Sequence, residues 1–240
     1  MKKVEKEAVS TAELLAIYQA LDRVQAIIEF DLDGIVLKAN DNFLRTFGYE
    51  AEEIVGQHHR IFCEAGYAKS SEYVDFWKKL GRGEQNEAEF KRFGKGGKEI
   101  WLRASYNPVL DKDGTPLKVV KFATDVTEEK LLSAEFEGKA EAIDRAQAVI
   151  EFGLDGSVIT ANDNFLKIFG YSHDEIVGKH HRIFCEAGYA DSPDYAEFWR
   201  KLARGEYTAG EFKRVGKNGD EIWLQASYNP IFDADGRPRK

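Results

Sequence analysis

The sequence has only two cysteines in 240 residues, Cys63 and Cys185. They occupy equivalent places in two repeated segments, so a disulfide cannot close within either segment, and a reducing compartment is expected. The chain also lacks any run of 18 or more apolar residues, and no basic and apolar leader follows Met1. Neither secretion nor a membrane span is expected in this stretch, and the sequence predicts a cytoplasmic location.

An excess of basic residues is absent as well. The chain has 34 Lys and Arg against 42 Asp and Glu, a formal net charge of −8. Because no basic stripe is visible, neither nucleic acid nor an anionic membrane is expected as a partner. Signatures of catalysis are also missing: there is no nucleophile with a base at recognisable spacing, no phosphate-binding glycine loop, and no CxxC or HExxH motif. The sequence therefore predicts an acidic protein that is not an enzyme and holds no dedicated metal site.

The chain contains two copies of one module. The eleven residues HHRIFCEAGYA occupy 58–68 and return unchanged at 180–190, an offset of 122 residues. The same offset, without a gap, relates NDNFL at 40 and 162, EIVG at 53 and 175, EIWL at 99 and 221, and ASYNP at 104 and 226. Solenoid repeats have periods of roughly 20 to 50 residues, so this period indicates a duplicated domain.

A helix is predicted ahead of the first copy, within residues 1–24. Ser10 and Glu13 form a capping box, and Leu14, Ile17 and Leu21 follow on one helical face. This apolar stripe is narrow, as in a seam between two helices, so the helix is a candidate for dimerisation. The alternative is that it covers its own domain.

Each copy then has the same order of elements. Two strands joined by an Asp-Gly turn are followed by short helices, the second of which ends in EIVG. A longer amphipathic helix begins after Ser70 and carries Tyr73, Phe76, Trp77 and Leu80. Three strands are predicted after it, at 88–93, 98–109 and 117–126.

A helical linker is predicted to begin at Thr127 and to continue through Leu131, Phe136 and Ile143 into the second copy. The predicted organisation is therefore an N-terminal helix at 1–24, a first domain at 25–127, a linker at 128–146 and a second domain at 147–240.

This order of elements, with NDNFL, FGY and EIVG followed by FKR, EIWL and ASYNP, resembles the PAS fold with its C-terminal PAC motif. The resemblance covers both copies and implies an α+β fold: two tandem PAS domains, each a five-stranded antiparallel sheet with small helices on one face. Asp125-Val126-Thr127 resembles the Asp-x-Thr by which PAS domains pass a signal to a following helix, so Asp125 and Thr127 are candidate relay residues.

More narrowly, tandem PAS modules with HHRIFC resemble the N-terminal half of soluble methyl-accepting chemotaxis proteins of the biofilm-dispersion type, and the modules resemble the PAS domain of aerotaxis receptors. This resemblance implies the dimeric sensory input region of a chemotaxis-type transducer that detects redox state, oxygen or a small ligand. It also implies a signalling coiled coil beyond residue 240 that binds the coupling protein and histidine kinase of the chemotaxis array.

Two other functions remain open. The chain is alternatively the input region of a sensor histidine kinase or of a cyclic-di-nucleotide enzyme. It is otherwise a PAS dimerisation scaffold without a ligand.

The second copy stops before the first one does. Lys240 aligns with Lys118, so nothing in the second copy corresponds to residues 119–127. In PAS domains the final strand lies in the middle of the sheet, and without it neighbouring strands keep unpaired edges. We therefore expect the sequence to be a fragment of a longer protein, with the second copy the less stable half.

Haem and flavin are the candidate cofactors. His58 and His59, repeated as His180 and His181, follow EIVG where PAS domains place their cavity-lining helices. One histidine of a pair would ligate haem b iron, while Cys63 or Cys185 lines the pocket. Adjacent histidines point in different directions, so at most one of each pair faces a pocket. The alternative is that they cap a helix or pair at the surface.

For flavin, the light-sensing branch of the family has its adduct-forming cysteine where this chain has His59, so light-driven adduct formation is not expected. Non-covalent FAD remains possible, with its ring between two tryptophans and near two asparagines. The candidate residues are Trp77, Trp101, Asn40 and Asn42 in the first copy, with Trp199 and Trp223 in the second. Aromatic residues at helical spacing are otherwise simply core residues, and a module without cofactor is the third possibility.

Overall fold

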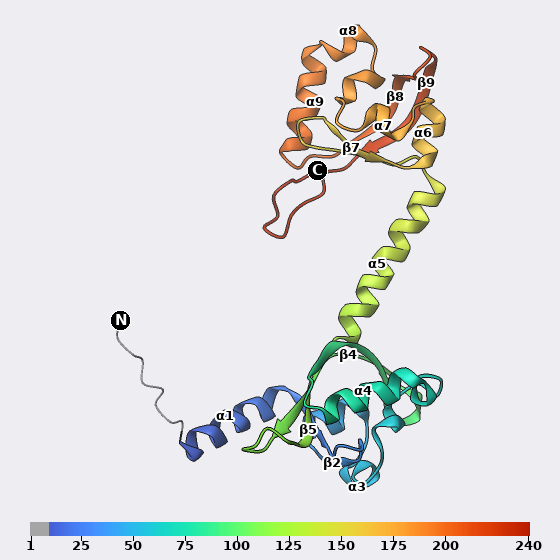
Figure 1. Ribbon diagram of the computed structural model, residues 1–240. Helices are drawn as coiled ribbons and strands as arrows, with labels where there is room; N and C mark the ends of the chain where they lie inside the picture. The colour runs from blue at the N-terminus through green and yellow to red at the C-terminus, as the bar shows by residue number, and fades with distance from the viewer. Residues whose placement is uncertain (1–9) are drawn as a thin grey trace. The chain divides into compact units, whose positions relative to one another are not determined.

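A computed structural model describes residues 10–240 (Figure 1), so residues 1–9 of the predicted N-terminal helix lie outside the described part. The chain divides after Ala134 into two compact units, and the boundary falls within helix α5 (Thr127–Ala146). None of the helices in residues 10–240 has the length and apolar character needed to cross a membrane.

The first unit is built on one sheet of five strands. The strands are antiparallel, in the order β2-β1-β5-β4-β3, so the last strand along the chain lies in the centre, between the first and the fourth. In chain order the elements are α1 (Thr11–Val24), β1 (Ala26–Phe30), β2 (Val36–Ala39), α2 (Asp41–Phe47), α3 (Ala51–Ile54), η1 (His59–Phe62), η2 (Tyr67–Lys69), α4 (Ser71–Gly81), β3 (Asn86–Phe93), η3 (Lys95–Gly97), β4 (Glu99–Leu110) and β5 (Pro116–Asp125).

Local signals explain where the helices begin and end. The Asn40 side chain accepts a hydrogen bond from the Phe43 amide at the start of α2, and Gly48 ends that helix with φ of 73°, a conformation that favours glycine. Ser70 caps α4 by accepting from the Tyr73 amide. These caps fix the first residues of α2 and α4, and the aromatic residues Tyr73, Phe76 and Trp77 of α4 are buried in the core.

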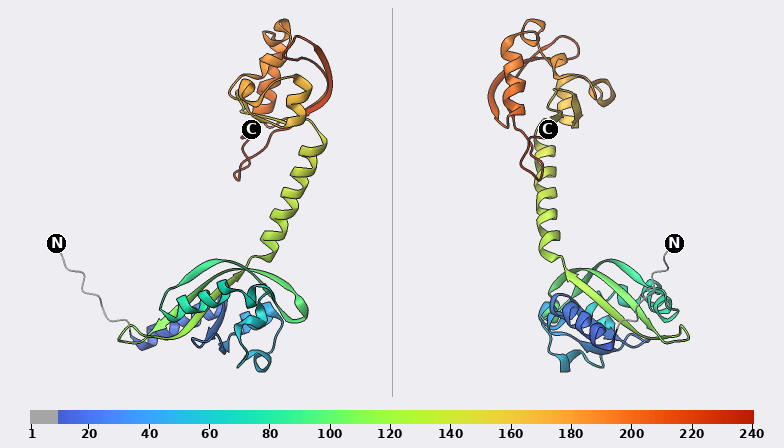
Figure 2. Two further views of the ribbon diagram at one scale, coloured as in Figure 1. Left: turned by 45° about the vertical axis from the view of Figure 1, so that its right-hand side comes forward. Right: turned by 90° about the vertical axis from the view of Figure 1, so that its left-hand side faces the viewer.

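The core lies between the concave face of the sheet and the helices, and Figure 2 shows the sheet curving around them. Alternate residues of a strand point to opposite faces. In β4, Ile100, Leu102 and Tyr106 are buried against the helices, whereas Trp101 and Arg103 lie on the outer face. The apolar side chains of α2, η1 and α4 complete this core.

The second unit repeats these helices and strands. Its elements are β6 (Ile150–Phe152), β7 (Val158–Ala161), α6 (Asp163–Phe169), α7 (His173–Ile176), η4 (His181–Phe184), α8 (Ala187–Ala190), α9 (Pro193–Ala203), β8 (Thr208–Val215) and β9 (Glu221–Tyr228). The strands form two separate pairs, β6-β7 and β8-β9, because no strand within 135–240 takes the central place that β5 has in the first unit.

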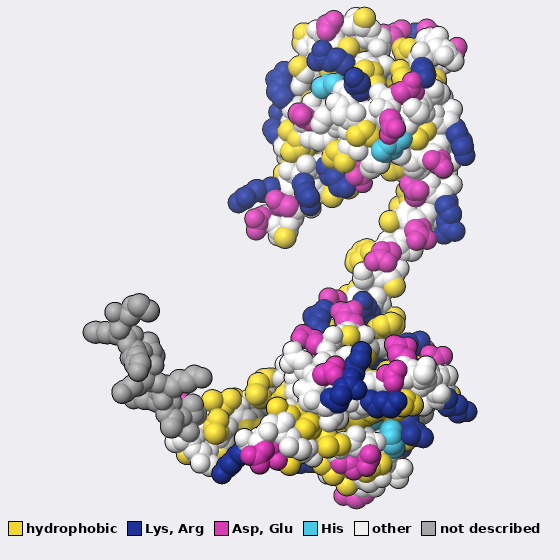
Figure 3. Space-filling model, in the orientation of Figure 1, with side chains coloured by type: hydrophobic (Ala, Val, Ile, Leu, Met, Phe, Trp, Pro, Cys, Tyr) yellow, Lys and Arg dark blue, Asp and Glu magenta, His cyan; other side chains and the backbone are white. Residues whose placement is uncertain are grey.

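The predicted α+β fold class is confirmed. The three strands after α4 differ from their predicted bounds by two residues or fewer at each end. Helix α1 contains no buried residue, and Figure 3 shows apolar side chains along it. Leu14 is 55% exposed and Ile17 is 51% exposed, so the predicted stripe does not pack into the core of the first unit.

Candidate functional site

The centre of the first unit is a histidine held between two tyrosines. His59 comes from η1, Tyr73 from α4 and Tyr106 from β4, and the His59 side chain is only 1% exposed. Its Nδ1 lies 2.9 Å from the Tyr73 hydroxyl, and its Nε2 lies 2.9 Å from the Tyr106 hydroxyl. The cluster therefore joins a short helix, a long helix and the sheet through the ring of one side chain.

The charge state of His59 follows from its burial. Desolvation holds the pKa of His59 well below its usual value, and the nearby Arg92 and Lys121 cations lower it further. Burial likewise raises the pKa of Tyr106 to about 12. The imidazole is thus neutral at pH 7, with one N–H donor and one acceptor nitrogen, so one tyrosine donates to the ring and the other accepts from it.

Two cations border this cluster. Arg92 of β3 is 3% exposed and Lys121 of β5 is 2% exposed. Arg92 Nη2 lies 3.5 Å from the Tyr106 hydroxyl, and Lys121 Nζ lies 4.8 Å from the centroid of the Tyr106 ring. Among the ion pairs that residues 10–240 form, none includes either side chain, and Arg92 Nε has no hydrogen-bond partner.

The second unit contains the same arrangement. His181 Nδ1 lies 3.0 Å from the Tyr195 hydroxyl and Nε2 lies 3.2 Å from the Tyr228 hydroxyl, while Arg214 Nη2 lies 3.0 Å from the Tyr228 oxygen. Desolvation lowers the pKa of His181 to about 3. The cluster is therefore a property of the duplicated sequence.

The predicted pocket cysteines lie beside these histidines. Cys63 Sγ lies 3.6 Å from His59 Nδ1, and Cys185 Sγ lies 3.6 Å from His181 Nδ1. Burial raises the pKa of both thiols, which keeps them protonated at pH 7.

The neighbouring histidine has a different environment. His58 is half-buried, and its Nδ1 accepts a hydrogen bond from the Arg60 amide. Its ring lies edge-on to Trp77, which packs in the core and whose Nε1 has no partner. Gly34 closes this corner with φ of 84°, and a Cβ there would lie 2.8 Å from the Trp77 ring. His180, Trp199 and Gly156 repeat the arrangement.

The prediction that Trp77 and Trp101 flank one flavin ring is wrong for this arrangement. Trp101 lies on the outer face of β4, opposite to the face on which Trp77 packs, and the Lys130 ammonium lies 5.7 Å from the centroid of one of its rings. In the second unit Trp223 is 67% exposed. Alternation along the strand separates the two rings.

Asn40 and Asn42, predicted as polar partners of a cofactor, form hydrogen bonds within the chain. Asn40 Oδ1 accepts from the Ile27 and Phe43 amides, and its Nδ2 donates to the Gln25 carbonyl at 2.8 Å. Asn42 Nδ2 donates to the Asp22 carbonyl at 2.9 Å. Both amides thus fasten the end of α1 to the start of α2.

Comparison with known families identifies this arrangement. The sequence model described as the PAS fold matches residues 36–123 and 158–240, which is more than half of the chain. The chain belongs to the PAS fold family. Each of its two units contains a PAS module, here called PAS module 1 and PAS module 2, and each module contains one His-Tyr-Tyr cluster.

Two curated relatives are similar in sequence. The biofilm dispersion protein BdlA of Pseudomonas aeruginosa is 50% identical over 218 residues, which are 91% of this chain and 52% of that protein. The aerotaxis receptor of Escherichia coli is 29% identical over 124 residues, 52% of this chain and 24% of the receptor. The chain therefore spans about half the length of the first relative. Among solved structures, an RNA-binding light-oxygen-voltage receptor aligns with a TM-score of 0.46 at 23% identity, over 58% of this chain and 41% of that one.

Neither haem nor flavin fits the residues as they are arranged in PAS module 1. Both ring nitrogens of His59 are occupied by tyrosine hydroxyls, and His58 Nδ1 is occupied by the Arg60 amide. The rings of Phe30, Phe76 and Tyr106 fill the space around His59, with centroids 5.3 to 6.2 Å from its own. In residues 10–240, no group of three or more His, Cys, Asp or Glu side chains is arranged to hold a metal ion.

The predicted relay residues join PAS module 1 to α5. The Thr127 hydroxyl donates to Asp125 Oδ1 at 2.6 Å and accepts from the Trp101 amide at 2.9 Å. The Val126 amide donates to the Trp101 carbonyl at 2.8 Å. The first turn of α5 is therefore bonded to the backbone of β4.

Four residues of the cluster were not predicted as site residues: Tyr73, Tyr106, Arg92 and Lys121. Tyr106 belongs to the repeated ASYNP, and Arg92 belongs to a repeated Phe-Lys-Arg. For Lys121 the alternation of residues along β5 is a usable signal. Val119 and Ala123, two positions away on either side, are both apolar, which indicates that Lys121 faces the core with them.

Proposed function

We propose that this chain is the sensory input region of a chemotaxis-type signal transducer and performs no catalysis itself. Its PAS modules respond to redox state, oxygen or a small ligand, and helices carry the response to a downstream signalling domain. The similarity to BdlA and to the aerotaxis receptor supports the proposal. The observation that carries it is that one strand, β4, contacts both the buried cluster and the start of α5.

The route from the cluster to the helix is short. Tyr106 bonds to His59 on the inner face of β4, and Trp101, five residues earlier on the same strand, bonds to Val126 and Thr127. A change in the cluster that shifts β4 therefore changes the hydrogen bonds that fix the first turn of α5. Such a junction can bias a helix between two packings, which is how many sensory modules switch.

The partners and the domain limits belong to the same proposal. The exposed apolar stripe of α1 and the exposed Leu131, Phe136 and Ile143 of α5 suit a cytoplasmic homodimer in which each helix packs against its copy. The domains are those predicted from the sequence, with PAS module 1 at 25–127, the linker at 128–146 and PAS module 2 at 147–240. The coupling protein and histidine kinase of a chemotaxis array would be bound by a region outside this chain.

A chimera tests the function. The chain replaces the matching segment of the Pseudomonas BdlA protein in cells that lack BdlA, and biofilm dispersion is measured. We expect the chimera to restore dispersion and the double substitution Asp125→Ala with Thr127→Val to abolish it, since the latter removes the hydrogen bonds of the Thr127 hydroxyl to the Asp125 carboxylate and from the Trp101 amide.

The matched control for this chimera is Asp113→Ala in the exposed turn between β4 and β5, which should respond like the parent. A chimera that disperses equally well with and without the Asp125–Thr127 bonds would identify the modules as a passive scaffold and contradict the proposal.

A further inference from the structure

We propose that PAS module 1 binds a small organic carboxylate with an apolar body, in a groove whose inner end is formed by Arg92. The inference rests on the proposed sensory function for its purpose and specifies the chemistry of the ligand.

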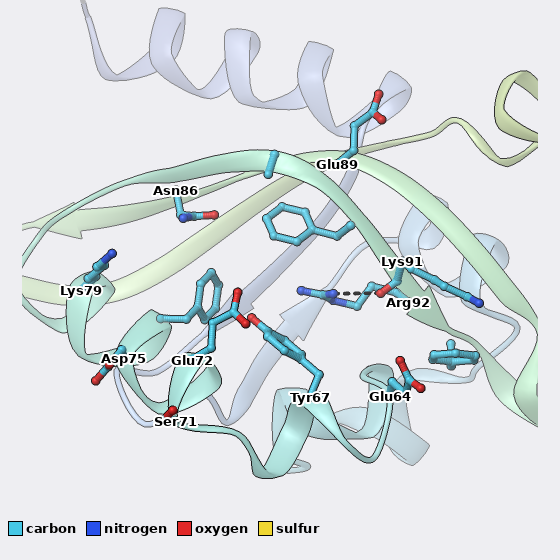
Figure 4. Close-up of a pocket in the computed structure, with 14 residues that line it drawn as sticks. Glu64, Tyr67, Ser71, Glu72, Asp75, Lys79, Asn86, Glu89, Lys91 and Arg92 are labelled. Carbon is cyan, nitrogen blue, oxygen red and sulfur yellow. Dashed lines mark hydrogen bonds between the residues drawn. The ribbon is translucent and has the colours of Figure 1, made fainter. Parts of the chain in front are cut away.

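The groove lies between β3 and the segment from η2 to α4 and has a volume of about 800 Å³. Tyr67, Phe76 and Phe90 supply apolar surface within it. Figure 4 shows the side chains of Tyr67, Glu72 and Arg92 pointing toward its middle, Arg92 from the strand and the other two from the helical side. The groove can therefore surround a flat or branched apolar group.

The Arg92 guanidinium lies over the rings of Phe90 and Tyr67, with its carbon 4.7 and 5.7 Å from their centroids, but it has no anionic partner among residues 10–240. Only 3% of Arg92 is exposed, and no carboxylate among residues 10–240 pairs with it. Nη1 donates to the Lys91 carbonyl at 2.9 Å, Nη2 reaches the Tyr106 hydroxyl at 3.5 Å, and Nε has no partner. Buried charges in proteins are usually paired, since an unpaired one is costly. An anion in the groove would supply the missing partner.

Lys121 strengthens the case for an anion. It points into the same core from β5, and no carboxylate among residues 10–240 forms an ion pair with it. The two cations repel each other, and desolvation and Arg92 together lower the pKa of Lys121. A negative charge beside Arg92 offsets this repulsion and so stabilises the protonated form of Lys121.

The charges around the groove select the kind of anion. Glu64, Glu72, Asp75 and Glu89 line it against Lys79 and Lys91. This excess of acidic groups disfavours a multiply charged anion such as phosphate. A single carboxylate matches the forked N–H groups of one guanidinium, and the apolar walls accept the rest of the molecule.

Binding at this place reaches the relay directly. A carboxylate that draws the guanidinium outward changes the contact between Arg92 and Tyr106, and the Tyr106 hydroxyl also bonds to His59. Tyr106 lies on β4, which holds the start of α5. Occupancy of the groove thus alters the strand through which the response is proposed to travel.

The test uses the whole chain and three probes: benzoate, its neutral isostere benzamide, and inorganic phosphate. Binding is measured by calorimetry and by tryptophan fluorescence, because Trp77 packs in the same core. We expect benzoate to bind at millimolar concentration or below, and about tenfold or more tighter than benzamide, since a hydrogen-bonded charge pair contributes that much. Phosphate should bind more weakly than benzoate.

The variants assign the binding to Arg92. Arg92→Met should abolish discrimination between benzoate and benzamide, Arg92→Lys should retain a weaker preference for benzoate, and Lys121→Met should weaken benzoate binding. The exposed Arg82→Met is the control for loss of one charge and should bind as the parent does. Arg92→Lys keeps the test decisive where Arg92→Met does not fold.

Three results would overturn the inference: absence of benzoate binding, equal affinity for benzoate and benzamide, or stronger binding of phosphate. Benzoate binding that survives Arg92→Met but is lost in Arg214→Met would also overturn it, because the site would then belong to PAS module 2. Any of these results, together with a chimera that still disperses biofilms, would refute the ligand site and leave the proposed function standing.

Discussion

At His59 the fold removes a titratable ring from water and gives each of its nitrogens a tyrosine partner. The same is true of His181 in PAS module 2. Both rings are buried in their neutral form, so a proton on either ring destabilises the folded state. The chemistry of these two residues therefore has a consequence for stability that can be measured without knowing the ligand.

We predict that stability falls as the pH drops from 6.5 to 5. The pKa of His59 and of His181 is depressed in the folded chain, whereas an unfolded histidine has a pKa of about 6.5. The unfolded state thus takes up protons first, so stability is fully present above about pH 6.5 and falls by about 1.4 kcal/mol per pH unit for each histidine below it. Denaturant unfolding across this range measures the slope.

His59→Phe should remove the part of this slope that His59 contributes and leave the parts that His58 and His181 contribute. The titration of the histidine ring protons by NMR is the companion measurement. A His59 ring that titrates with a midpoint near pH 6.5 in the folded chain would refute the buried, neutral assignment.

Asn40 is predicted to be a structural residue. Asn40→Ala removes the cap of α2 and leaves the Ile27 amide without its partner, so the free energy of unfolding should fall by about 2 to 4 kcal/mol. Asn42→Ala loses hydrogen bonds to the Asp22 and Gln25 carbonyls and an exposed one from the Arg45 guanidinium, and should cost about 1 kcal/mol. If both substitutions left the free energy of unfolding nearly unchanged, Asn40 would not be a structural residue and would again be a candidate ligand contact.

Single residues also mark the limit of what the sequence could predict. The histidines and cysteines of the site were recognised because they stand in the repeated HHRIFC. Arg92 and Lys121 were missed because charged side chains are almost always exposed, and a pattern of polar and apolar residues assigns them to the surface. Trp101 was placed in the wrong environment because a shift of one residue along a strand exchanges its two faces.

Among the elements, β5 matters most, and no strand within residues 135–240 takes its place. In PAS module 1, β5 pairs with β1 along its first edge and with β4 along its second. In PAS module 2, β6 and β9 each pair with one neighbour only. The order of elements was predictable because caps and turns are local signals, such as Asn40, Gly48 and Ser70. The separation of the second unit's strands into the pairs β6-β7 and β8-β9 agrees with the alignment of the two copies, in which residues 119–127 have no counterpart.

We predict from this difference that, when residues 1–240 are studied alone, PAS module 2 opens more readily than PAS module 1. Backbone amides of β9 should exchange with solvent faster than those of β4, because β9 has one neighbouring strand whereas β4 lies between β3 and β5. Hydrogen exchange followed by mass spectrometry compares the equivalent peptides at 99–106 in β4 and 221–228 in β9. Equal protection in the two peptides would contradict the assignment of β5 as the element that secures the sheet.

At the scale of the whole molecule, the account predicts association through α1. The exposed Leu14 and Ile17 lie on one face of this helix, and charges placed there should prevent packing against a second copy. We expect the chain to sediment as a dimer and the double substitution Leu14→Glu with Ile17→Glu to sediment as a monomer. Val74→Glu on the exposed face of α4 is the matched control and should remain dimeric.

The proposed dimerisation has a clear contrary result. A wild-type chain that is monomeric at all accessible concentrations would show that α1 serves its own module or a partner of another kind.

The central claim is that the polar core of PAS module 1 is coupled through β4 to the start of α5. Hydrogen exchange at the Trp101 and Val126 amides, which form the junction, tests it most directly. Tyr106→Phe removes one buried hydroxyl, and we predict faster exchange at both amides, whereas the matched Tyr228→Phe in PAS module 2 should leave them unchanged. Identical exchange at the junction in the parent chain and in Tyr106→Phe would contradict the claim.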